Sequence, residues 1–84
     1  MDPPLIERLS SRGFHRVDMP DTMEAEINGI GITAVVHPLK GLALLASGGN
    51  RDTIGFAETY VPLEASREVL RNAITRITGG ILRP

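Results

Sequence analysis

Histidine is the residue type in this chain that is best suited to acid–base or metal chemistry. Its two copies are His15, which follows Phe14 at the start of an expected strand, and His37, which precedes Pro38 at an expected turn. A metal site or an acid–base pair needs partner ligands at short spacing or on a facing strand, and the sequence places no such set beside either residue. We interpret both as surface histidines and expect no metal site.

The carboxylates and serines give a similarly negative result. Glu24 and Glu26 are two residues apart on one expected strand, so they could form an acidic pair in a cleft. The same spacing is typical of a sheet face that contacts water. Ser10, Ser11 and Ser66 lack the arrangement of histidine and acid that activates a nucleophile. We expect no catalytic residues and no enzyme activity.

Glycine-rich stretches are the remaining candidates for ligand binding. Gly29-Ile30-Gly31 matches the start of a dinucleotide fingerprint, but a third glycine and a following helix are missing. Residues 47–50 could present backbone N–H groups to an anion, yet the sequence after them has neither a helix nor the lysine of a phosphate-binding loop. We interpret the first as a hairpin turn and the second as a connector, and expect no cofactor.

The stretch that organises the chain is residues 23–47, in which we expect two successive β-hairpins. The first turn is Asn28-Gly29 between Ile27 and Ile30, the strongest short signal for a type I′ turn. A two-residue loop fixes the register and places apolar residues on one face. The predicted pairs are Ile27 with Ile30, Ala25 with Ile32, and Met23 with Ala34.

The second turn is Pro38-Leu39-Lys40-Gly41. A left-handed Gly41 that forms a one-residue bulge would pair Val36 with Leu44 and Ala34 with Ala46. In this register the helix-covered face of the sheet receives Ala25, Ile27, Ile30, Ile32, Val36, Leu42 and Leu44. The second face then keeps an apolar remainder, and the candidate protein interface comprises Thr33, Val35, His37, Ala43 and Leu45.

The flanking segments complete the expected fold. Residues 2–12 predict a short helix with Asp2 as its N-cap and Gly13 as its left-handed stop, followed by a short strand over 14–19. Residues 53–61 predict a strand with Ile54 and Phe56 inward, and 63–78 a helix that ends at Gly79-Gly80. The order α-β-β-β-β-β-α predicts an α+β two-layer sandwich, in which an antiparallel meander sheet of about five strands carries both helices on one face.

Composition limits the classes of function. The 84 residues make one expected domain, 1–84, with 42% hydrophobic and 23% charged residues and a net charge of −1. This charge argues against a strong attraction to nucleic acid or to anionic membranes. The chain has no cysteine and no apolar run of bilayer length, so we expect a cytoplasmic protein without membrane contact.

Two resemblances bear on function. The run from Gly41 to Gly49, apolar and then Gly-Gly, together with the flanking helices, resembles the small chaperones of type III secretion. Those chaperones are typically more acidic and place a helix between their strands. In size and kind the chain is also similar to the small inhibitors that phages direct at bacterial machinery, including anti-CRISPR proteins.

The expected function is therefore a small non-enzymatic protein-binding module that acts as an inhibitor or adaptor on a larger bacterial complex. The partner is an unidentified protein or a second copy of the chain. A chaperone like those of type III secretion is one alternative. Another alternative is a small nucleic-acid-binding domain that uses Arg67 and Arg71 of the last helix. Glu64 and Glu68 argue against this alternative, because they are interleaved with the arginines at i, i+3 spacing and can pair with them.

Overall fold

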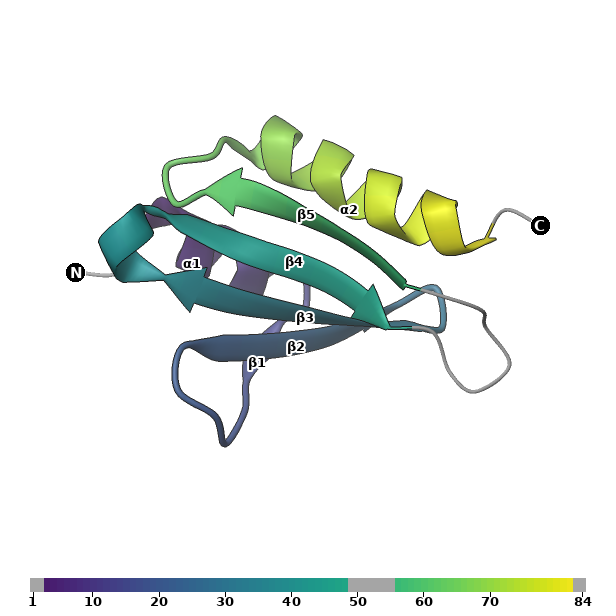
Figure 1. Cartoon of the computed structure of the whole chain (residues 1–84), viewed down its shortest axis with the longest axis horizontal. Helices are drawn as coiled ribbons and strands as arrows, with labels where there is room; N and C mark the ends of the chain where they lie inside the picture. Colours follow the sequence, from purple (N-terminus) through teal and green to yellow (C-terminus); the bar gives the residue numbers. More distant parts are fainter. Residues whose placement is uncertain (1–2, 49–55, 83–84) are drawn as a thin grey trace.

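Five antiparallel strands form one sheet whose spatial order, β1-β2-β3-β4-β5, follows the order of the chain (Figure 1). The structure is a computed structural model that describes residues 3–48 and 56–82. The elements are α1 (Pro4–Ser11), β1 (His15–Arg16), β2 (Thr22–Ile27), β3 (Ile30–His37), the 3-10 turn η1 (Pro38–Lys40), β4 (Leu42–Gly48), β5 (Phe56–Pro62) and α2 (Arg67–Leu82). The predicted α+β fold and its element order are confirmed.

The first hairpin forms as predicted. Strands β2 and β3 pair Ile27 with Ile30, Ala25 with Ile32 and Met23 with Ala34. Asn28 and Gly29 have φ angles of 53° and 79°, and positive φ at both central positions is what a type I′ turn requires. The turn therefore fixes the register that buries one face of this hairpin.

Replacing Gly29 tests this turn. We expect Gly29→Val to lower the free energy of unfolding by more than about 1 kcal/mol, because a β-branched residue resists positive φ. Apart from Gly29 and its two chain neighbours, no heavy atom of the described residues lies within 4 Å of the position that a Cβ would take. The loss of stability would therefore come from backbone strain and not from a steric clash. Chemical denaturation measures it. The control is Gly31→Val on β3, where space is equally open and φ is not positive; equal stabilities of the two variants would contradict the turn.

The predicted register of the second hairpin is wrong by one residue. Strands β3 and β4 pair His37 with Leu42, Val36 with Ala43, and Ala34 with Leu45. Gly41 is left-handed, with φ of 70°, as expected. It lies within the loop that follows η1, however, and adds no extra residue to β4. Because His37 pairs directly with Leu42, no bulge shifts the strand.

This shift exchanges the two faces of β4. Ala43 and Leu45 are fully buried, with 0% of their surfaces exposed, whereas Leu42 and Leu44 are only half-buried. The prediction that Leu42 and Leu44 face the helices is therefore wrong. The same shift removes Ala43 and Leu45 from the predicted interface, since side chains on a strand alternate between faces.

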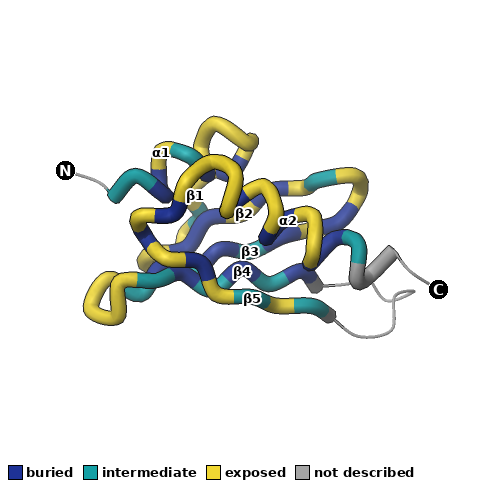
Figure 2. Tube along the Cα trace, turned by 90° about the horizontal axis from the view of Figure 1, so that it is seen from above, coloured by how far each residue is buried: buried dark blue, intermediate teal, exposed yellow. Residues whose placement is uncertain are grey.

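Both helices cover the same face of the sheet (Figures 1 and 2). Ile6 of α1 lines a hollow together with Met23 and Val36 of the sheet. From the other helix, the Ile77 carbonyl accepts a 3.2 Å hydrogen bond from the hydroxyl of Ser47 on β4, which also donates to Ala57. The largest fully buried side chains are Leu5, Leu9, Ile32, Leu45, Leu70, Ile77, Val61 and Ser47.

The helix ends depart from the prediction in detail. Gly13, with φ of 93°, follows the end of α1 as expected, whereas the predicted cap Asp2 lies outside the described residues. Helix α2 begins at Arg67 because the Ser66 hydroxyl accepts a 3.2 Å hydrogen bond from the Val69 N–H. It continues past Gly79, which lacks the positive φ of a helix stop, so the predicted end at 78 is wrong.

Two predicted strands are also revised. The strand expected over 14–19 is reduced to His15–Arg16, and the chain then turns at Asp21, which has φ of 54°. Strand β5 is described from Phe56, so Ile54 and the side chain of Phe56 lie outside what the structure describes. Pairing with the buried positions of β4 places Ala57, Thr59 and Val61 on the helix side of β5.

Candidate binding surface

The sheet face opposite the helices carries an apolar strip. Its central row follows the pairing of Thr22 with Val35, Val35 with Leu44, and Leu44 with Tyr60 across four strands. We define the open-face strip as Val35, Leu42, Leu44, Ala46, Tyr60 and Pro62. Tyr60 is 61% exposed, although the chain has only three aromatic residues with which to build a core.

Acidic side chains lie along one end of the open-face strip. A row of paired residues runs from His15 through Glu24, Thr33 and Ala46 to Glu58. Glu26 follows Glu24 by two residues on β2 and lies on the same face. All three glutamates are exposed. Arg16, the one arginine or lysine of the described strands, pairs with Met23 and so belongs to the helix side of the sheet. The open face is therefore apolar in its middle and negative at one end.

The structure brings together part of the predicted interface. Thr33, Val35 and His37 lie on the open face and are half-buried, while Ala43 and Leu45 lie in the core.

The largest omission from that prediction is Tyr60. A signal was present, because Glu58 marks the water-facing positions of β5 and Tyr60 follows it by two residues. Assigning Leu42, Leu44 and Ala46 to this face requires the correct register of the second hairpin, because a shift of one residue moves them to the other face.

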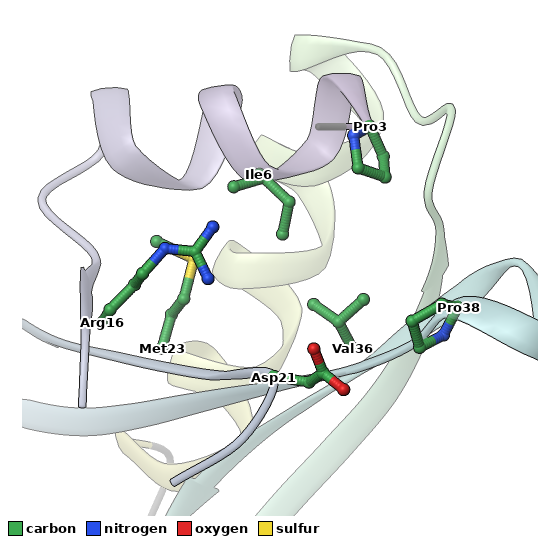
Figure 3. A pocket seen from close by; sticks show the side chains of 7 residues that line it. All are labelled: Pro3, Ile6, Arg16, Asp21, Met23, Val36 and Pro38. Carbon is green, nitrogen blue, oxygen red and sulfur yellow. The ribbon is translucent and has the colours of Figure 1, made fainter. Parts of the chain in front are cut away.

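A small pocket lies between α1 and the sheet (Figure 3). Its volume is about 190 Å³, and its lining consists of Pro3, Ile6, Arg16, Asp21, Met23, Val36 and Pro38. Small-molecule sites usually have volumes of about 300–1,000 Å³. In Figure 3 the carboxylate of Asp21 lies beside Val36 and the guanidinium of Arg16 lies near Met23. The pocket has room for a side chain or a few atoms.

The other candidate groups are dispersed. His15 lies on β1 opposite Glu24, whereas His37 lies at the far end of β3. Across residues 3–48 and 56–82 no group of three or more histidine, aspartate or glutamate side chains is placed to hold a metal ion. Within those ranges no helix has the length and apolar character needed to cross a bilayer. Arg67 and Arg71 are exposed on α2 and line a groove with Arg12.

No protein-family model, curated protein or solved structure matches the chain.

Proposed function

We propose that this protein is a non-enzymatic protein-binding module that docks its open sheet face onto a larger partner and acts there as an inhibitor or adaptor. The observation that carries the proposal is the open-face strip. Neither helix covers it, and Leu44 and Tyr60 present apolar surface at its centre. Contiguous apolar surface with a polar edge is typical of protein–protein contact sites.

The charge pattern indicates the chemistry of the partner. Glu24, Glu26 and Glu58 are exposed at one end of the face, where His15 pairs with Glu24, and no lysine or arginine of the described strands shares this face. Complementary potentials favour a partner surface with an apolar centre and lysine or arginine at its edge. Such a partner would bury the strip and pair the glutamates.

A second copy of the chain is a poorer occupant of this face. If two copies packed face to face around a two-fold axis parallel to the strands, the glutamates of one copy would lie against the glutamates of the other. If the two-fold axis ran perpendicular to the strands within the interface, the glutamates of each copy would lie against the apolar end of the other, around Leu42 and Pro62. The first arrangement places like charges together and the second buries unpaired carboxylates, and both carry a free-energy cost.

Photo-crosslinking from two positions tests this proposal. A photoreactive phenylalanine analogue replaces Tyr60 on the open face in one variant and Val69 on α2, which is 46% exposed, in the other. In a lysate of the organism that produces the protein, we expect the variant with the analogue at Tyr60 to capture a partner and the variant with the analogue at Val69 to capture none. Mass spectrometry of the product should locate the crosslink on a surface with apolar and basic residues.

Affinity measurements with the captured partner complete the test. Leu44→Glu should weaken binding by about tenfold or more, because it places a charge at the centre of the strip. Val69→Glu, the matched control on the helical side, should leave the affinity unchanged. Unchanged binding by Leu44→Glu, or capture from Val69 alone, would contradict the proposal.

A further inference from the structure

Four arginines from the end of α1 and the start of α2 line two hollows on the helical side of the molecule. Arg12, Arg67 and Arg71 line a hollow of about 280 Å³ together with Glu68. Arg8, Arg12 and Arg67 line a second hollow of about 340 Å³ together with Ser11. Arg12 and Arg67 line both hollows, which therefore adjoin, and we call the two together the arginine groove.

The fold holds these side chains in place. Arg8 and Arg12 are four residues apart at the end of α1, and Arg67 and Arg71 are four residues apart at the start of α2, so each pair follows one helix face. Arg8 is half-buried, and its Nη1 donates a hydrogen bond to the carbonyl of Ala65, just before α2. This contact joins α1 to the segment that leads into α2 and holds one guanidinium at the wall of the groove.

Helix stability does not account for all of this charge. A cation near the C-terminus of α1 is favourable, which explains Arg8 and Arg12. Arg67 is the first residue of α2, where the helix dipole disfavours a positive side chain. Among the described residues that line the groove, Glu68 is the one carboxylate beside four arginines. The positive charges of these arginines therefore repel one another. An anion between them would remove that repulsion.

The geometry points to a compact, multiply charged phosphate anion of the pyrophosphate class as the ligand of the arginine groove. Guanidinium groups form paired, charge-assisted hydrogen bonds with phosphate oxygens. The N-terminus of α2 adds positive potential at Arg67. Both hollows are open to solvent and have room for several water-sized groups, so a compact anion can reach the guanidinium groups.

Single-stranded nucleic acid fits the same groove less well. Such ligands need a positive track several nucleotides long and aromatic side chains on which bases stack. Of the aromatic side chains that the structure describes, Phe14 is buried and Tyr60 lies on the opposite face of the sheet. The arginine groove spans about one turn of each helix, which matches a short anion.

Calorimetric titration of the full chain with inorganic pyrophosphate tests the assignment. At an ionic strength of about 0.15 M we expect saturable binding with a Kd below about 1 mM. Arg12→Ala and Arg67→Ala should each weaken binding by about tenfold or more, because both residues line both hollows. The control is Arg76→Ala, an exposed arginine of the same helix that lines neither hollow, and it should bind as the parent does.

Thermal unfolding supplies an independent readout. Pyrophosphate should raise the melting temperature of the parent and of Arg76→Ala but not that of Arg67→Glu. The Arg67→Glu variant without ligand should melt at or above the parent temperature, because it replaces an unfavourable charge at the start of α2. Melting well below the parent would show that Arg67 serves the fold, and the inference would fall.

Three other results would overturn the inference. Absence of saturable heat with pyrophosphate would remove the site. If Arg76→Ala lost as much affinity as Arg12→Ala and Arg67→Ala, pyrophosphate would be attracted to the positive charge of the whole surface and not to the groove. Tighter binding of a single-stranded oligonucleotide than of pyrophosphate, lost in Arg12→Ala, would assign the groove to a nucleic-acid backbone. None of these outcomes bears on the open sheet face, so the groove and the proposed function fail or stand separately.

Discussion

Leu45→Glu should remove a large part of the stability of the protein, so that the variant unfolds at a low concentration of denaturant. Leu45 is 0% exposed and pairs with Ala34 and Thr59 on the face that the helices cover. The substitution removes a buried aliphatic side chain and places a carboxylate among apolar neighbours, so we expect a loss of more than about 4 kcal/mol. A domain of 84 residues has a total stability of about 4–13 kcal/mol. Circular dichroism at low denaturant concentration should show lost secondary structure.

Leu44→Glu is the matched control for this experiment. Leu44 is the preceding residue on the same strand and is half-buried on the open face, between Val35 and Tyr60. We expect this variant to keep a folded spectrum and a cooperative thermal transition. If Leu45→Glu folded and Leu44→Glu did not, the bulged register would be correct, because a shift of one residue exchanges the two faces of a strand.

Leu70→Ala should lower the free energy of unfolding by roughly 2–5 kcal/mol, the range for truncating a buried leucine. Leu70 is 0% exposed on the side of α2 that packs against the sheet. The melting temperature should fall by more than about 8 °C, since 1 kcal/mol corresponds to at least about 4 °C in a domain of this size. Ile74→Ala, one turn further along α2, should have a cost in the same range.

Val69→Ala is the control for the docking of α2. Val69 precedes Leu70 in the helix and is 46% exposed, so its truncation should change stability by no more than about 0.5 kcal/mol. In the sequence Val69 continues the apolar stripe of Leu70, Ala73, Ile74 and Ile77, but its exposure places it outside the buried face of α2. Near-neutral results for both Leu70→Ala and Ile74→Ala would mean that α2 does not pack on the sheet.

The first hairpin was predictable because two local signals agree. Asn28-Gly29 permits few turn types, and the alternation around Ile27 and Ile30 matches the register that this turn imposes. The α+β class followed from the two amphipathic helices at either end of the strands. Such agreement between turn chemistry and side-chain pattern makes a local prediction firm.

The second hairpin lacked this agreement. A left-handed Gly41 is compatible both with a bulge and with a loop residue, and residues 42–45 are apolar on both faces. Only the packing of Leu45 and Ser47 against the helices decides the register, and that information is not local. The arginine groove was hidden for the same reason, since Arg8 meets Ala65 across 57 positions of the chain.

The meander order of the sheet has a consequence for how the chain folds. Every strand pairs with its neighbour in sequence, so each step of sheet formation closes a short loop with a small entropic cost. The long-range step is the closure of α1, whose Leu5 N–H donates a 3.1 Å hydrogen bond to the Leu63 carbonyl. We infer that the hairpins of β2, β3 and β4 nucleate folding and that α1 docks late. Changes in the first hairpin would then slow folding, whereas changes in α1 would mainly accelerate unfolding.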